Sequence, residues 1–316
     1  METAIKFIDI KKAFNKKVVF ENVNLEIKQK EIFGIIGMSG SGKTTLLNTL
    51  IGFYTPDAGD ILFYSKIDNE YKSVFNSLPE VRRTFGFATQ VPSLYPKLTV
   101  KENLAYFSTL HRIPKQIAEN NISVLLDITE LSSEKNQLVQ NLSEGMKKRL
   151  SIACALIHNP SILLLDEPTA DLDPLLRKEI WRLVERVHRS GTTIILASHF
   201  LDEIEAICHR VAVIHNGRII PPSQVSKLKA SLKQDQEILL RSEPGNYHKL
   251  AKLLAKSKRV KKLVIKGRHL SIKTDNAERL LSTVISAAKS AKEKITELKL
   301  LKSSLESVFE QIHESK

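Results

Sequence analysis

The stretch GMSGSGKTT, residues 37–45, decides the fold of this chain. It matches the spacing G-x-x-x-x-G-K-[ST], with Gly37, Gly42, Lys43 and Thr44 in register. The apolar run EIFGIIG precedes it and the helically spaced run TTLLNTLIGF follows it, so the motif stands between a predicted strand and a predicted helix. This context is typical of a phosphate-binding loop and not of a chance glycine-rich turn.

Each residue type in this loop suits a nucleotide phosphate. Glycine lets backbone N–H groups turn toward an anion, and the helix that begins near Lys43 adds the positive end of its dipole. Lys43 supplies a charge for the β- and γ-phosphates, and the Thr44 hydroxyl is suited to Mg²⁺. We expect the whole loop to bind nucleotide; its residues are Gly37, Met38, Ser39, Gly40, Ser41, Gly42, Lys43, Thr44 and Thr45.

The second strong signal is SILLLDEPTADLD, residues 161–173. The ILLL run predicts a buried strand that ends in Asp166 and Glu167. A carboxylate at the end of a strand beside a phosphate loop fits Mg²⁺ ligation. Because neighbouring strand residues point to opposite faces, the two carboxylates divide the work. We assign Asp166 to the metal and Glu167 to the attacking water as its base.

Three further residues are candidates by position. The buried run TTIILASH predicts a strand that ends in His199, where a γ-phosphate contact follows the same strand-edge logic. TFGFATQ predicts a strand ending in Gln90, whose amide oxygen can ligate Mg²⁺ or hold a water. Phe14 lies in a polar turn ahead of the loop; its spacing fits stacking on an adenine ring and packing at a strand end equally well.

The remaining pattern defines the organisation of the chain. Residues 1–220 predict an α/β core with an inserted helical subdomain over about 92–158, in which Ser143 is placed as a helix N-cap. Composition and charge change at PPSQVSK, which predicts a linker over 221–235. Residues 236–316 read β-α-β-β-α-β plus a terminal helix, the pattern of a small ferredoxin-like α+β domain.

The positive charge is concentrated in the C-terminal part. Residues 221–316 hold 21 Lys/Arg against 10 Asp/Glu, and the whole chain has a net charge of +13. This asymmetry indicates an anionic partner, such as lipid headgroups, nucleic acid or an acidic protein face, unless the basic face is simply solvated. The run KSKRVKK, 256–262, is either a membrane-facing segment or a solvated loop.

The composition also predicts the compartment. No apolar run approaches the ~20 residues of a membrane helix, and METAIKFIDI lacks the apolar core of a signal peptide. Cys154 and Cys208 lie in apolar helical contexts, which predicts buried, reduced thiols. We expect a cytosolic chain, so a partner must supply any membrane spans.

Taken in order, these motifs resemble those of the ATP-binding subunits of ABC transporters, over about residues 4–220. GMSGSGKT is similar to Walker A and ILLLDE to Walker B. ADLD is similar to the D-loop, ending in Asp173, and LSEGM at 142–146 stands where the family has its LSGGQ signature. Gln90 looks like the Q-loop glutamine and His199 like the switch histidine.

The resemblance carries further implications for the site. Phe14 falls where the family places its adenine-stacking aromatic. The cofactors implied are ATP and Mg²⁺, with the metal held by Thr44, Gln90 and Asp166. Ser143 and Gly145 are the phosphate-facing pair of the signature, although Glu144 and Met146 depart from its glycine and glutamine.

The closest resemblance is to the ATPases of ABC-2-type exporters of the drug and antibiotic-resistance type. Their small C-terminal domains often end in a run similar to LESVF, 305–309. The resemblance implies export through a separate membrane-spanning permease on whose cytoplasmic face the chain sits. It also implies a head-to-tail pair of nucleotide-binding domains, either homomeric or heteromeric.

Two rival classes of protein share some of these features. A soluble ABC ATPase acting on nucleic acid or the ribosome fits the basic tail. The single nucleotide-binding domain, the lack of a heptad arm and the lack of a Cys-rich insert argue against it. The order of LSEGM and the Walker B run argues against a P-loop kinase, and the Gln–His arrangement argues against a GTPase.

Overall fold

In this computed structural model the chain divides into two compact units, Met1–Val225 and Ser226–Lys316. The described residues are 2–15, 17–215, 217–224, 236–257, 259–267, 269–274 and 276–301.

An antiparallel sheet begins the first unit. Strands β1 (Thr3–Phe14) and β2 (Lys17–Lys28) form a hairpin, and β4 (Ala58–Ser65) pairs with the other edge of β1. Strand β5 (Glu70–Ser73) then pairs with β4, followed by helix α2 (Leu78–Thr84). The four residues of β5, EYKS, show no clear alternation, so this strand has no periodic signal of its own in the sequence.

A six-stranded sheet forms the centre of this unit, in the order β10-β9-β3-β8-β7-β6. Strands β6, β7, β8, β3 and β9 are parallel, and β10 is antiparallel to β9. Strands β3, β7 and β8 are buried along their whole length, which explains their unbroken apolar sequences. The bounds are β3 Ile32–Ile36, β6 Phe85–Ala88, β7 Ile162–Asp166, β8 Thr193–Ser198, β9 Arg210–His215 and β10 Arg218–Gln224.

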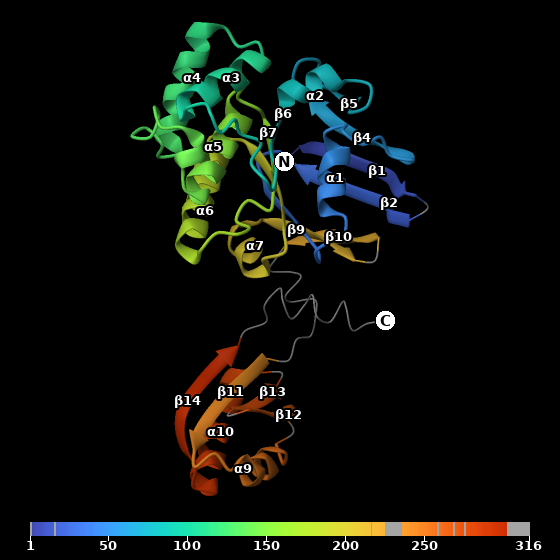
Figure 1. Cartoon of the computed structure of the whole chain (residues 1–316). Helices are drawn as coiled ribbons and strands as arrows, with labels where there is room; N and C mark the ends of the chain where they lie inside the picture. The colour runs from blue at the N-terminus through green and yellow to red at the C-terminus, as the bar shows by residue number, and fades with distance from the viewer. Residues whose placement is uncertain are drawn as a thin grey trace. The chain divides into compact units, whose positions relative to one another are not determined.

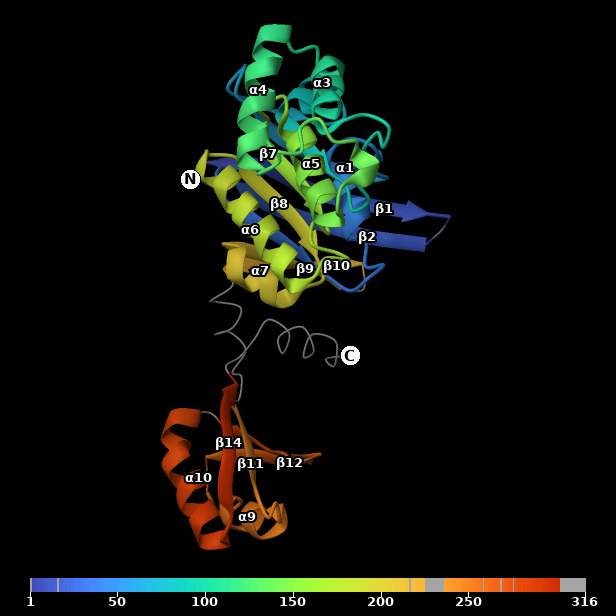
Figure 2. The same cartoon turned by 60° about the vertical axis from the view of Figure 1, so that its left-hand side comes forward.

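Helices cover this sheet and fix the positions of its connections. Helix α1 (Lys43–Leu50) packs against β7 and β8, and α5 (Glu144–Leu156) packs against β6 and β7 (Figure 2). Helix α7 (Leu201–Ile207) lies against β3, and α6 (Pro174–Arg189) packs against α5.

The predicted helical insert contains α3 (Val100–Leu110), α4 (Lys115–Ile128), the 3-10 turn η1 (Val139–Asn141) and α5. Figures 1 and 2 place α3 and α4 at the opposite end of the unit from α7. Thr99 caps α3 in a reciprocal capping box with Glu102. The insert has its own apolar cluster, which includes Leu104, Ile122 and Leu150.

Two predicted boundaries are wrong in detail. Strand β6 ends at Ala88, two residues before Gln90, so Gln90 follows the strand instead of ending it. Strand β10 runs to Gln224, so residues 221–224 of the predicted linker belong to the sheet. The rest of that linker, residues 225–235, lies outside the described residues.

In its described residues, the second unit consists of an antiparallel sheet in the order β12-β13-β11-β14 and two helices (Figure 1). Both helices share one apolar cluster with Ile238, Leu240, Leu270 and Ile272, so they cover the same face of the sheet. The terminal helix predicted around LESVF lies outside the described residues. The bounds are β11 Gln236–Glu243, α9 Tyr247–Leu254, β12 Val260–Lys266, β13 His269–Thr274, α10 Ala277–Ala291 and β14 Lys294–Leu301.

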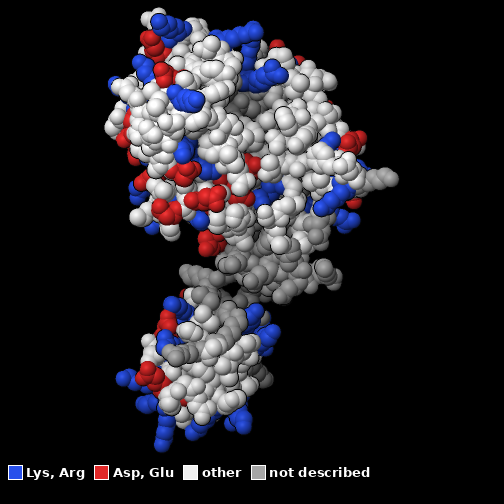
Figure 3. Space-filling model, viewed as in Figure 1, with Lys and Arg blue, Asp and Glu red and all other residues white. Residues whose placement is uncertain are grey.

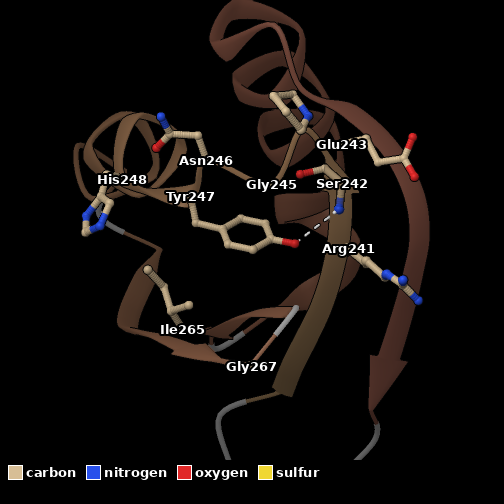
Figure 4. A pocket seen from close by; sticks show the side chains of 10 residues that line it. Arg241, Ser242, Glu243, Gly245, Asn246, Tyr247, His248, Ile265 and Gly267 are labelled. Atoms are coloured by element: carbon tan, nitrogen blue, oxygen red, sulfur yellow. Dashed lines mark hydrogen bonds between the residues drawn. The ribbon is translucent and has the colours of Figure 1, made fainter.

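A cavity of 580 Å³ lies in this second unit, where β11 leads into α9 (Figure 4). The Tyr247 side chain points across it, and its hydroxyl accepts a hydrogen bond from the Ser242 N–H at 3.2 Å. The buried Glu293 carboxylate accepts from the Ser242 hydroxyl and from the N–H groups of Gly245 and Asn246. These bonds brace the turn, so the cavity is bordered by groups that already have partners.

Candidate nucleotide-binding site

The register of the parallel strands brings the predicted site residues to one sheet edge. Ile36 of β3 lies beside Ser198 of β8, and Asp166 of β7 lies beside Ala197 of β8. The phosphate loop, Glu167 and His199 follow these three strand ends directly. Segments more than a hundred residues apart in the sequence therefore meet at one point of the fold.

Lys43 is the buried centre of the site. Its ammonium donates to the carbonyl oxygens of Gly37 at 2.9 Å and Met38 at 3.3 Å, inside the loop. Its third contact is Oε1 of Glu167, at 3.2 Å. The ammonium thus has a full set of acceptors, and contact with a phosphate requires it to exchange at least one of them.

Glu167 connects Lys43 to His199. Its Oε2 lies 2.9 Å from Nδ1 of His199 and 3.4 Å from the His199 backbone N–H. Glu167 adopts a left-handed φ of 46°, and its N–H donates to the Ala197 carbonyl of β8 at 2.9 Å. This turn ends the strand between Asp166 and Glu167, so the two carboxylates leave it in different directions.

Asp166 is almost completely buried and has an unsatisfied oxygen. Its Oδ1 has no hydrogen-bond partner among the described residues, whereas the carboxylate accepts a hydrogen bond from the Thr44 side chain. Burial raises the pKa of Asp166, and the Thr44 hydrogen bond opposes that rise. An orphaned carboxylate oxygen beside a hydroxyl is the oxygen donor set that Mg²⁺ prefers, so these residues fit that ion.

The phosphate loop needs its glycines for space. Gly42, at the start of α1, has a left-handed φ of 104°, and a Cβ there would lie 2.7 Å from Val19 of β2. A Cβ on Gly37 would lie 2.4 Å from the Ser41 hydroxyl. That hydroxyl is buried without a partner among the described residues. Met38, Ser39, Gly40 and Thr44 are exposed, and Thr45 is half-buried.

Phe14 ends β1, on the hairpin whose β2 strand contacts Gly42. Its ring is 41% exposed and packs edge-on against Tyr54, with the ring centroids 5.2 Å apart. The Lys12 ammonium lies over the same ring, 5.1 Å from its centre, so Phe14 already contacts both an aromatic ring and a cation. The adenine contact stays a prediction.

Gln90 is exposed beyond β6, and its backbone is held by a residue that sequence reasoning missed. The Lys148 ammonium, on α5, donates to the Gln90 carbonyl. Lys148 is buried, and this burial lowers its pKa. A lysine near the polar start of a helix is predicted to be a solvated charge. Only the packing of α5 beside β6 shows that Lys148 is buried against Gln90.

Ser143, Gly145 and Asp173 lie at helix starts. Ser143 caps α5 by accepting from the Met146 N–H at 3.2 Å, as predicted, and Asp173 caps α6 by accepting from Leu175 and Leu176. Gly145 is buried, and a Cβ there would meet Leu176 at 2.9 Å. In the described parts of the chain, no hydrogen bond or ion pair joins these three residues to the phosphate loop.

This fold and site define the chain as a P-loop nucleoside triphosphatase. The model of the family described as "ABC transporter" matches residues 20–170. The Nod factor export ATP-binding protein I of Paraburkholderia xenovorans is 36% identical over 230 residues, covering 73% of this chain and 74% of that protein. The bacitracin transport ATP-binding protein BcrA of Bacillus licheniformis is 36% identical over 230 residues, covering 72% of each.

Solved structures agree with the fold. The cbiO1 subunit of the cbiONQ transporter of Clostridium perfringens has a TM-score of 0.66 at 28% identity, covering 73% of this chain and 92% of that one. The ATP-binding cassette MJ1267 has a TM-score of 0.64 at 27% identity, covering 72% and 93%.

The chain belongs to the family of ABC transporter ATP-binding subunits, and it is an ABC-type ATPase. The predicted resemblance, the ATPase class and the fold of the core are thereby confirmed. In the described parts of the chain, no helix is long and apolar enough to cross a membrane.

Proposed function

We propose that this chain hydrolyses ATP to drive export through a separate membrane-spanning subunit, at whose cytoplasmic face it is bound. The observation that carries the proposal is the chain of contacts Lys43–Glu167–His199 at the edge of the parallel sheet, in which Lys43 and Glu167 are buried and His199 is exposed. A degenerate nucleotide site would have no reason to keep a base, a phosphate ligand and a histidine within hydrogen-bond distance of one another.

The site residues divide the chemistry among them. Lys43 and the N–H groups of the loop bind the phosphates, and Glu167 takes a proton from the attacking water. His199 orients Glu167 and contacts the γ-phosphate. Thr44, Gln90 and Asp166 would hold Mg²⁺, which supplies positive charge against the phosphates when bound. Catalysis then consists mostly of positioning and electrostatic stabilisation.

The second half of the site comes from another nucleotide-binding domain. Ser143 and Asp173 lie at the starts of α5 and α6, where both are exposed. A head-to-tail dimer would bring Ser143 and Gly145 to the nucleotide of the partner. Light scattering of the Glu167→Gln variant should show a dimer with ATP and a monomer without it. A nucleotide-independent mass would overturn this arrangement.

The relatives that are similar to this chain are named for export of Nod factor and transport of bacitracin. Purification of the tagged full-length chain from membranes in mild detergent tests whether this chain also works with a membrane partner. We expect an integral membrane protein in stoichiometric amount. Recovery with RNA or ribosomes instead, or with no partner, would overturn the export proposal.

We further propose that the second unit contacts anionic lipid through one face of its sheet. Lys and Arg lie along much of the outline of this unit in the view of Figure 3. Because Leu240 and Ile272 face the helices, the alternate residues Arg241 and Lys273 lie on the other face. Lys262 lies directly opposite Lys273.

We call Arg241, Lys262, Lys273 and Lys299 the basic face. Glu237 lies opposite Lys273 in the strand register. Glu297 lies opposite Arg241 and pairs with Lys299, so acidic residues offset part of the positive charge. The repulsion between Lys262 and Lys273 on neighbouring strands remains, and an anionic surface would relieve it. Each cation near such a surface contributes about 1 kcal/mol, decaying over a Debye length of roughly 8 Å. Lys262 also belongs to the run KSKRVKK that the sequence singled out.

Vesicle sedimentation of the full chain tests this contact. We expect binding to phosphatidylglycerol vesicles at low salt, its loss at high salt, and none to phosphatidylcholine. The pair Lys262→Gln and Lys273→Gln should weaken it, whereas Lys249→Gln and Lys252→Gln, the same charge loss on α9, should not. Equal binding to both lipids, or binding to RNA in their place, would contradict it.

A further inference from the structure

Arg177, in the first turn of α6, joins three segments that surround the nucleotide site. Its Nε donates to the Leu172 carbonyl at 2.8 Å, and its Nη1 lies 3.3 Å from Oε1 of Glu203 on α7. Its Cζ lies 3.9 Å from the centre of the Phe200 ring. One planar group therefore contacts the segment after β7, the segment after β8 and α7.

The Glu203 carboxylate extends this link toward Glu167. Its second oxygen accepts a hydrogen bond from the Thr169 hydroxyl at 2.6 Å, and Thr169 is fully buried. Thr169 follows Glu167 by two residues on the same turn. The contacts Arg177–Glu203–Thr169 thus cross-link the turn that carries Glu167 to α7.

The other contacts of Arg177 reach the remaining site segments. Phe200 directly follows His199, and the centres of their rings are 4.1 Å apart. Leu172 directly precedes Asp173, the residue that starts α6 and belongs to the proposed dimer face. Displacement of the Arg177 side chain would therefore release His199 and the segment 169–173 from each other.

The contacts use properties that only a guanidinium combines. Its flat face stacks on the Phe200 ring while its edge donates to a carbonyl and a carboxylate in fixed directions. An ammonium in its place keeps the charge but cannot stack or donate along the same two directions. The Arg177 side chain is 27% exposed, so these directed contacts, together with partial burial, fix its position.

We propose that Arg177 is a positioning residue, which holds the Glu167 turn and His199 in the arrangement needed for hydrolysis. The inference rests on the roles proposed above for Glu167 and His199. Arg177 itself makes no contact with the phosphate loop among the described interactions. Its loss should therefore reduce kcat, because small displacements of reacting groups are costly, and leave nucleotide binding nearly unchanged.

The test compares full-length Arg177→Met, Arg177→Lys and Glu203→Gln in steady-state ATP hydrolysis and in binding of a fluorescent ATP analogue. We expect kcat to fall about 10- to 100-fold in Arg177→Met, with KM and the analogue Kd within about threefold. Arg177→Lys should recover only part of the loss. The double variant Arg177→Met/Glu203→Gln should lose about as much as Arg177→Met alone, because the two residues act as a unit.

Arg189→Met is the matched control, since Arg189 lies at the exposed end of the same helix. A kcat of Arg177→Met equal to that control would overturn the proposal. So would a parallel loss of kcat and analogue binding together with a lower Tm, or full recovery by lysine. If Glu167→Gln hydrolyses ATP at the parent rate, the proposed function fails instead, whatever Arg177→Met does.

Discussion

The ammonium of Lys43 lies 3.2 Å from Oε1 of Glu167, and both side chains are almost fully buried. The residue expected to bind the phosphates therefore neutralises the residue expected to activate water. Removing one member of a buried pair leaves the other charge uncompensated. Substitutions at these two positions should consequently affect binding, hydrolysis and stability in different proportions.

Glu167→Gln should keep ATP binding and nearly abolish hydrolysis. The amide cannot accept the proton of the attacking water, and loss of a general base costs about 10²- to 10⁴-fold. ATP affinity should stay the same or rise, because Lys43 loses an anion that competes with the phosphates. Phosphate release and equilibrium nucleotide binding measure the two effects. Hydrolysis at the parent rate would remove Glu167 from its assigned role.

Lys43→Ala should weaken nucleotide binding and also destabilise the unit without ligand. The buried Glu167 carboxylate would keep only His199 as a partner, and breaking a buried pair typically costs about 3–5 kcal/mol. The double variant Lys43→Ala/Glu167→Gln should therefore melt at a higher temperature than Lys43→Ala. Lys66→Ala, an exposed lysine, serves as the control. If the double variant melts lower than Lys43→Ala, the pair is not a stabilising unit.

Glu144→Gly should leave ATPase activity within a few-fold of the parent. Glu144 begins α5 without a left-handed φ, and its carboxylate lies 2.7 Å from the Lys147 ammonium, which draws it along the helix surface. The site thus has no steric need for the glycine that the signature usually has here. A gain of about 100-fold or more would show that Glu144 restrains the site by charge repulsion.

Sequence patterns predicted the site residues where the chemistry allows only a few residue types at a fixed spacing. The loop Gly37–Thr45 and the strand ending in Asp166 carry their chemistry in spacing alone, and the structure brings them together as expected. The switch from β-period to helical period also predicted the insert and the order of elements in the second unit.

The contacts that could not be predicted from the sequence depend on tertiary packing. Lys148 and Arg177 sit in helices that read as solvated faces, yet one is buried against Gln90 and the other cross-links two turns. The short strand β5 forms because β4 offers it an edge, and its four residues have no periodicity of their own.

A chain ending at Leu228 should fold and hydrolyse ATP. The last strand of the six-stranded sheet, β10, ends at Gln224. The chain divides into two compact units directly after it, at Val225. Thermal unfolding and phosphate release of the truncated chain check this. A matched truncation after His215, which removes β10 and exposes the edge of β9, should precipitate or unfold. Failure of the longer chain to fold would show that the second unit stabilises the first.

The stability of the first unit should fall between pH 6.5 and pH 4 because of two stacked histidines. The rings of His111 and His158 are 3.8 Å apart and nearly parallel, between α3, α5 and β6. Burial and, to a smaller extent, the charge of His111 lower the pKa of His158 to about 4, against the opposing effect of its hydrogen bond to the Phe85 carbonyl. Burial also lowers the pKa of His111.

The sign follows from proton binding. An unfolded histidine titrates near 6.5, so below that pH the unfolded chain binds protons that the folded chain does not. These histidines therefore do not reduce the free energy of unfolding above pH 6.5. Below that pH the free energy of unfolding declines as the pH falls toward 4. His158→Gln should reduce this decline by an amount on the order of 1–2 kcal/mol, although it costs stability at pH 7.5. Urea unfolding of parent and variant at pH 7.5, 6 and 5 measures the difference, with the exposed His248→Gln as control. Parallel stability curves for parent and His158→Gln would show that the stacked pair does not titrate on unfolding.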